Sequence, residues 1–258
     1  IPHESGGYLV KTNSSGFRCQ HEFVNEKPDK TFRVLLFGDS FTAGDGVSNK
    51  YRFGDLLEQR VGGLEVLNFG LSGTGTDQQY LAYEHYGSNL TFDLLLICPL
   101  VQNIKRVASR YETVITRDNG DVGFIAKPYF ELQDDELILK NTPVAKGILD
   151  RQELDEGDNF LANQGVVERA LRGVINRYLY PIKNLLQRTV AYDPVTEYSD
   201  ANGREWKLMK KILKDWVKSV GGVPAVICPI PLYHHVEELS SPVNYQRRFA
   251  ELSDEPNV

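Results

Sequence analysis

The chain has 258 residues, of which 41% are hydrophobic and 25% are charged, a composition typical of a soluble globular protein with one substantial core. The net charge of −6 argues against a protein that holds nucleic acid through a broad basic surface. No apolar stretch approaches the length of a membrane span, so we expect no membrane span in this chain.

The first 30 residues are polar and rich in glycine and asparagine, and they predict an irregular leader. The sequence starts at Ile1 rather than at methionine, so we expect that an upstream segment was removed. That segment would be an export signal, an anchor or a tag. Export and anchoring are therefore open for this chain, with the cytoplasm as the alternative.

From Thr31 onward the pattern alternates between strands and helices, which predicts one α/β domain over residues 31–258 with a parallel sheet. The predicted core strands cover residues 32–38, 65–69, 92–98 and 223–230. The predicted helices cover residues 52–61, 76–85, 166–188, 205–220 and 243–252. The strand at 92–98 is apolar throughout, so we expect it to be buried on both faces. Thr76 or Asp77 is the expected N-cap of the second helix.

The alternation breaks at residues 111–145, where short strands are predicted at 111–116, 122–127 and 137–140. Residues 118–120 read Asp-Asn-Gly, which is a hairpin turn signal. We therefore expect a β-rich insertion in the α/β domain.

Three segments that end successive core strands carry candidate functional residues. The first strand stops at Gly38-Asp39-Ser40, the second leads into the glycine-rich loop 68–73, and the third is followed by Asn103. The carboxyl ends of parallel strands meet at one edge of the sheet, where open α/β sheets build their sites. Ser40 is therefore a candidate nucleophile.

Acyl transfer by a serine also needs hydrogen-bond donors aimed at the developing oxyanion. The glycine-rich loop can present a backbone N–H, and the Asn103 side chain offers amide N–H donors. With the N–H of Ser40 these would form a three-donor oxyanion hole, in which each donor typically contributes about 3 kcal/mol.

These segments resemble the SGNH, or GDSL, family of hydrolases. Residues 37–44 (FGDSFTAG) look like the first family block, and residues 68–73 (NFGLSG) look like the second. The third block ends a strand with an asparagine, which Asn103 matches, although the family's usual Gly-x-Asn-Asp is here Val-Gln-Asn-Ile. The resemblance covers residues 31–145, and beyond residue 160 it is only architectural.

The resemblance implies a three-layer α/β/α flavodoxin-like fold and activity as an esterase, lipase or acyltransferase. It assigns Ser40 as the nucleophile and Gly73 and Asn103 as oxyanion donors. Residues 127–130 (KPYF) and 13–18 (NSSGFR) look like those of a bacterial subgroup linked to polysaccharide or cell-surface metabolism. An acylated carbohydrate is therefore the expected substrate class.

The family takes its catalytic Asp and His from an Asp-x-x-His near the C-terminus, and this sequence contains none. We expect the missing strand and histidine to belong to a segment beyond Val258. An alternative is that His234 or His235, which follow the fourth core strand, acts as the base. A third interpretation is that this pair lies in a solvated loop or binds substrate.

Several function classes follow from these residues. The first is a serine esterase or O-acyl hydrolase, and the second is an O-acyltransferase that uses a sugar hydroxyl as acceptor. The third is a ligand-binding module on a degenerate hydrolase scaffold. A nucleotide-binding protein is disfavoured because neither glycine loop has the order of a phosphate-binding motif.

No cofactor or metal is expected, because the three cysteines and five histidines show no metal-ligand spacing. Cys98 and Cys228 each stand in an Ile-Cys-Pro at the end of an apolar run. We expect both to be small buried residues at neighbouring strand ends, rather than a disulfide or a nucleophile.

Overall fold

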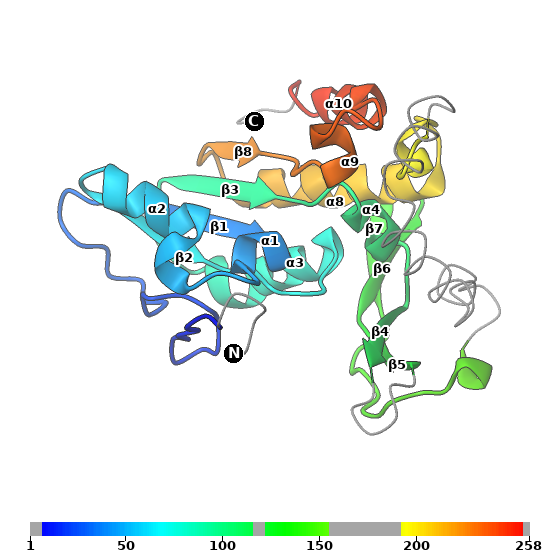
Figure 1. The fold of residues 1–258 in the computed structure, drawn as a ribbon, viewed down its shortest axis with the longest axis horizontal. Helices are drawn as coiled ribbons and strands as arrows, with labels where there is room; N and C mark the ends of the chain where they lie inside the picture. The colour runs from blue at the N-terminus through cyan, green and yellow to red at the C-terminus, as the bar shows by residue number, and fades with distance from the viewer. Residues whose placement is uncertain (1–6, 116–121, 155–191, 255–258) are drawn as a thin grey trace.

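The computed structural model describes residues 7–115, 122–154 and 192–254, and it shows a mixed α/β fold around a four-stranded parallel sheet (Figure 1). The strand order is β2-β1-β3-β8. The strands span β1 Phe32–Gly38, β2 Leu64–Asn68, β3 Leu94–Cys98 and β8 Ala225–Ile227. The predicted core strands are thus confirmed, with β8 shorter than expected. Pro224 and Pro229 flank β8, and proline has no N–H with which to extend the ladder.

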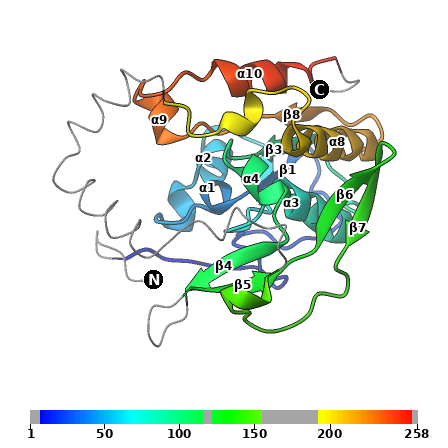
Figure 2. The ribbon, with the colours of Figure 1, turned by 90° about the vertical axis from the view of Figure 1, so that its right-hand side faces the viewer.

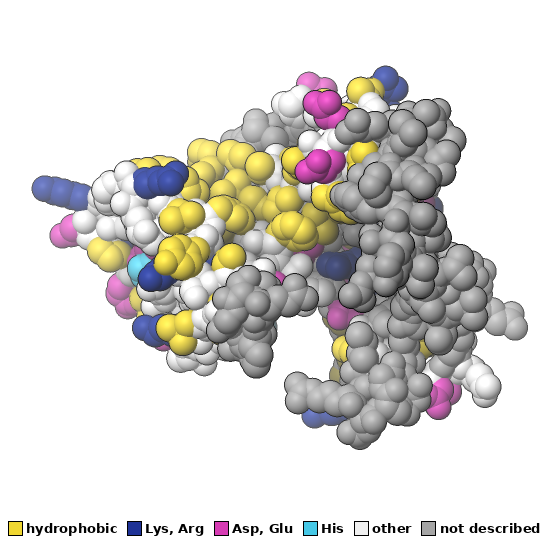
Figure 3. Space-filling model, viewed as in Figure 1, with side chains coloured by type: hydrophobic (Ala, Val, Ile, Leu, Met, Phe, Trp, Pro, Cys, Tyr) yellow, Lys and Arg dark blue, Asp and Glu magenta, His cyan; other side chains and the backbone are white. Residues whose placement is uncertain are grey.

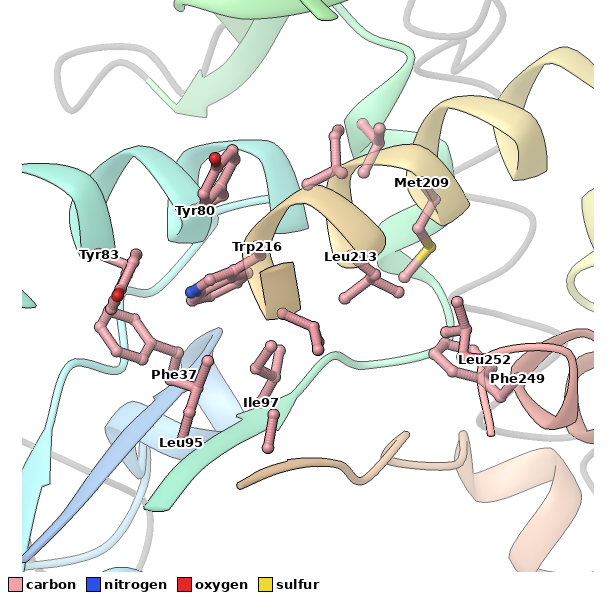
Figure 4. Packing of buried hydrophobic residues seen from close by; sticks show 14 of the residues in the cluster. Phe37, Tyr80, Tyr83, Leu95, Ile97, Met209, Leu213, Trp216, Phe249 and Leu252 are labelled. Atoms are coloured by element: carbon pink, nitrogen blue, oxygen red, sulfur yellow. The ribbon is translucent and has the colours of Figure 1, made fainter. Parts of the chain in front are cut away.

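One face of the sheet packs against helices α3 (Thr76–Ala82) and α8 (Arg204–Ser219). Figure 4 shows Trp216 of α8 lying between the sheet residue Phe37 and the tyrosines Tyr80 and Tyr83. Farther along α8, Met209 meets Phe249 and Leu252. Phe249 lies on α10 (Val243–Ala250), so this face carries the main core.

The other face is covered less completely. Helix α2 (Phe53–Arg60) packs on β2, where Gly54 approaches Leu36 and Val66. Over β3 and β8 the apolar side chains are partly open, and Figure 3 shows them as a hydrophobic patch on the surface. Leu94 and Leu96 are half-buried and Val226 is 45% exposed. The expectation that residues 92–98 are buried on both faces was therefore wrong for this face.

The insertion contains two antiparallel strand pairs, which lie beyond the carboxyl ends of the core strands (Figure 1). They consist of β4 (Tyr111–Ile115) with β5 (Val122–Ala126), and β6 (Tyr129–Gln133) with β7 (Glu136–Lys140). The sequence reasoning missed β6. The predicted turn at 118–120 and the predicted helix at 166–188 lie outside the described residues.

Shorter helices complete the described ranges. They are α1 (Ser40–Ala43), α4 (Asn103–Val107) and α9 (Tyr233–Val236), with 3-10 turns at Asn49–Tyr51, Arg151–Glu153 and Thr196–Tyr198. Helix α3 continues into a π-helical turn at Tyr83–Gly87, and its N-cap is Gly75 rather than Thr76 or Asp77. Among the described residues, no helix is both long and apolar enough to cross a membrane.

The leader is held on the domain by buried arginine contacts. The Arg18 guanidinium donates to the carbonyls of Ala43 (3.1 Å), Gly44 and Val47, just after α1. It also donates to Asn49 Oδ1 at 2.9 Å. The leader therefore supports the loop that follows Ser40.

Candidate active site

The turn from β1 into α1 fixes the position of Ser40. Ser40 is half-buried and is the first residue of α1, while the Asp39 carboxylate caps the helix by accepting the Phe41 N–H at 3.0 Å. Gly38 allows the turn, because a Cβ there would lie 2.0 Å from Thr42 Oγ1 and 2.8 Å from the Cys98 carbonyl oxygen. The sequence thus places the candidate nucleophile at the carboxyl end of β1, where α1 begins. Figure 2 views the domain from the side to which the core strands point in Figure 1.

The second loop is bound directly to this turn. The Asn68 side chain donates to the Thr42 carbonyl at 2.9 Å and accepts the Gly70 N–H at 2.8 Å. Gly70 lies so close to α1 that a Cβ there would be 2.3 Å from Ala43 N. The Ser72 hydroxyl then donates to the Asp45 carboxylate at 2.9 Å. Loop 68–73 is therefore joined by hydrogen bonds to the turn and loop that follow Ser40.

Gly73 ends this loop in a left-handed conformation, with φ of +84°, and it is exposed. Its nearest side-chain neighbour is the Glu112 carboxylate of β4, whose Oε2 would lie 3.7 Å from an added Cβ. The insertion therefore reaches the loop that carries the predicted oxyanion donor.

Asn103 begins α4 and is fully buried beside Asp39. With its carboxamide oriented by its neighbours, Nδ2 donates to Asp39 Oδ2 at 3.1 Å and Oδ1 accepts the Leu100 N–H at 3.3 Å. One turn later, Arg106 Nη1 lies 3.5 Å from the same Asp39 oxygen and donates to the Thr74 carbonyl at 3.1 Å. Asp39 and its partners thus connect all three predicted segments.

The Asp39 carboxyl is fully buried, and burial raises its pKa. The Phe41 N–H, the Arg106 guanidinium and the Asn103 amide act in the opposite direction, because each favours the charged form. The arrangement places the Asp39 carboxyl under the nucleophile turn and gives it hydrogen-bond partners on both oxygens.

A second buried ion pair lies under the same loops. Lys127 Nζ donates to Asp77 Oδ2, and neither side chain is more than 3% exposed. Burial raises the pKa of the Asp77 carboxyl, whereas Lys127 lowers it. Burial also raises the pKa of the nearby Glu112 carboxyl.

The sequence reasoning named Lys127 only within its KPYF run and Asp77 only as a candidate helix N-cap, and it did not select Arg106 or Glu112. A charged residue in a helix or at the end of a short strand is usually solvated, so the local pattern held no signal of burial. Only the tertiary contact between the insertion and α3 reveals this pair.

The described histidines contact residues other than Ser40. His21 of the leader lies with Nε2 2.7 Å from Oε1 of Glu58 on α2. The ring of His85 packs edge-on against that of Tyr86. His234 lies against the ring of Tyr233, and His235 Nδ1 accepts the Leu232 N–H at 3.2 Å. His234 and His235 follow β8 at the same sheet edge as Ser40, on α9.

The geometry thus brings together Ser40, its loop 68–73 and Asn103, and it adds Arg106 and Glu112. In the described part of the chain, no group of three or more His, Cys, Asp or Glu residues could hold a metal ion.

A scan of protein-family models finds no match to this chain, and a search of curated proteins finds none either.

Proposed function

We propose that this protein is a serine ester hydrolase of SGNH type, built on a three-layer flavodoxin-like domain. The observation that supports the proposal best is the convergence of the three predicted segments on the turn from Gly38 to Thr42. The turn that carries Ser40, loop 68–73 and the start of α4 are bonded to one another at the carboxyl edge of a parallel sheet. Such a constellation fixes a nucleophile and its donors before substrate arrives.

In the proposed reaction, Ser40 Oγ attacks the ester carbonyl and its proton passes to a histidine base. The backbone N–H groups of Ser40 and Gly73 and the side-chain amide of Asn103 hold the oxyanion. A carboxamide has two N–H donors, so Asn103 can keep its bond to Asp39 while the second N–H serves the oxyanion. The alcohol leaves, and water then releases the acyl group from Ser40.

Asp39 and Arg106 act as positioning residues in this proposal. The Asp39 carboxylate sets the start of α1 through Phe41 and the amide plane of Asn103 through Oδ2. Arg106 connects the same carboxylate to the Thr74 carbonyl after the second loop.

The test is active-site labelling with a fluorophosphonate, together with hydrolysis of a small activated ester such as p-nitrophenyl acetate. We expect one covalent adduct on Ser40, and loss of both adduct and turnover in Ser40→Ala. The matched control is Ser88→Ala, which removes an exposed hydroxyl outside the site and should retain both. Undiminished labelling of Ser40→Ala would overturn the proposal.

Two further results separate the neighbouring function classes. Transfer of an acetyl group to an added oligosaccharide, measured by mass, would identify an O-acyltransferase. A folded protein that neither labels nor turns over ester, but binds an acylated oligosaccharide in calorimetry, would be a ligand-binding module. The base would be identified by replacing His234 and His235 individually with Gln in a labelling-competent protein.

A further inference from the structure

Two cysteines lie side by side at the ends of neighbouring strands. Cys98 is the last residue of β3, and Cys228 directly follows β8. The register pairs Ile97 with Ile227, and the Cys228 N–H donates to the Ile97 carbonyl at 2.8 Å. Cys98 therefore stands opposite Cys228, and the ladder stops there because Pro99 has no N–H to return the bond.

This placement suits a disulfide. Neighbouring strands are about 4.8 Å apart, and bridged cysteines have Cα atoms about 4.4–6.8 Å apart. Paired residues point to the same face of a sheet, and Cys98 lies in the apolar cluster against which Leu94 and Leu96 of that face pack. The two cysteines are not bridged in this structure. Closing the bridge would therefore require side-chain rotation rather than movement of the strands.

The two thiols differ in environment. Cys98 is 3% exposed, whereas Cys228 is exposed and lies two residues after the exposed Val226 of β8. The contact with Cys98 lowers the pKa of the Cys228 thiol to about 6, since the Cys98 S–H can donate to a thiolate. The same contact and burial raise the pKa of Cys98. An accessible thiolate thus lies beside a buried thiol. The expectation that both are buried was wrong for Cys228.

We propose that Cys228 is an oxidation site for hydroperoxides, and that Cys98 resolves the oxidised residue into a cross-strand disulfide. The Cys228 thiolate attacks a peroxide oxygen, which gives a sulfenic acid on Cys228 and releases an alcohol, or water from hydrogen peroxide. Cys98 Sγ then forms the S–S bond, and the departing hydroxide takes the Cys98 proton and leaves as water. Two thiols are oxidised and one peroxide is reduced.

The bridge would join the strands that lead to Asn103 and to α9. Beyond the cysteines, the chains remain adjacent through the Val101 N–H to Ile230 carbonyl bond at 3.0 Å. The proposal does not depend on Ser40 chemistry.

Cys19 provides an internal control. It is 1% exposed, and burial raises the pKa of its thiol. Its sulfur accepts the Asn68 N–H at 3.4 Å, on the far side of β1 from the pair. Cys19 should therefore stay reduced under conditions that oxidise Cys228.

The experiment treats the folded protein with hydrogen peroxide and then denatures it in the presence of N-ethylmaleimide, which alkylates every free thiol. Intact mass counts the maleimide adducts, and peptide mapping locates them. We expect two fewer adducts than in the untreated protein and a Cys98–Cys228 linked peptide. Cys19→Ser should still lose two adducts, and Cys228→Ser should lose none. In Cys98→Ser, oxidation should stop at a sulfenic acid on Cys228 that dimedone captures.

Other outcomes would overturn the proposal. These are an unchanged adduct count in the wild-type protein, a linked peptide that contains Cys19, or a disulfide between two molecules on a non-reducing gel. The wild-type peptide map decides the matter even if a serine variant fails to fold.

Discussion

The apolar core under α8 and the polar cluster at the strand ends are built on opposite principles. In the core, Trp216 packs with ring centroids 5.1 Å from Phe37 and 5.8 Å from Tyr83, and apolar burial itself supplies the stability. At the strand ends, burial raises the pKa of three carboxyl groups, those of Asp39, Asp77 and Glu112.

The difference separates the region whose apolar burial stabilises the fold from the region on which the proposed reaction depends. A buried ion pair such as Lys127–Asp77 adds little net stability, because desolvation opposes the attraction. Buried charges with shifted pKa values instead mark candidate functional sites. The polar cluster surrounds the predicted oxyanion loop, in agreement with the proposed function.

The largest effect is expected in the apolar core. Trp216→Ala should lower the free energy of unfolding by about 3–5 kcal/mol, because it leaves a cavity between the sheet and α3. Urea unfolding followed by circular dichroism measures this change. The control is Val226→Ala on the open face, which should stay within about 0.5 kcal/mol. Equal effects would show that the two sheet faces are packed alike.

A comparable loss of stability is expected when the Lys127–Asp77 pair of the polar cluster loses its lysine. Lys127→Met should destabilise the protein by about 3–5 kcal/mol at neutral pH, because Asp77 is left without its buried partner. The exposed Lys207→Met is the control and should be near neutral.

The pH dependence of this variant has a definite sign. The pKa of Asp77 is already raised above its ordinary 3.8 in the folded state. Without Lys127 it rises further, so the folded state binds more protons than the unfolded state, and stability falls as pH increases above 3.8. The double variant Asp77→Asn with Lys127→Met should remove this slope. A slope that persists would assign it to another group.

A smaller effect is expected at the contact between the second loop and α1. Gly70→Ala places a Cβ against the Ala43 backbone, which should cost about 1–3 kcal/mol and reduce fluorophosphonate labelling of Ser40. Gly62→Ala is the matched control, because a Cβ there meets nothing within 4 Å. Normal labelling in a destabilised Gly70→Ala protein would show that the loop does not position Ser40.

The smallest effect is expected at the leader. The hydrogen bond with Glu58 raises the pKa of His21 above its ordinary 6.5. The stabilisation of the folded state by protonated His21 is therefore complete below pH 6.5, and it is lost as the pH rises through the folded-state pKa of His21. It should amount to less than about 1 kcal/mol, since His21 is partly exposed. The stability difference between wild type and His21→Gln should disappear at high pH.

The sequence predicted the parallel sheet because β1 and β3 are apolar runs closed by Gly38 and Pro99, which are strong local signals. It also predicted that Ser40, loop 68–73 and Asn103 meet, since that follows from strand direction. It could not predict the burial of Lys127 with Asp77, because their contact joins residues 50 positions apart. It could not predict the exposure of Cys228 either, which depends on what covers one face of the sheet.

The Arg18 contacts have a consequence for how the domain is delimited. A recombinant boundary drawn at Thr31, where the regular β/α pattern starts, would keep every core strand and still remove the donor for the Ala43, Gly44 and Val47 carbonyls. Those carbonyls belong to the end of α1 and the loop after it. The shortest unit that preserves the Ser40 turn therefore begins upstream of Arg18, within the segment that the sequence marks as irregular.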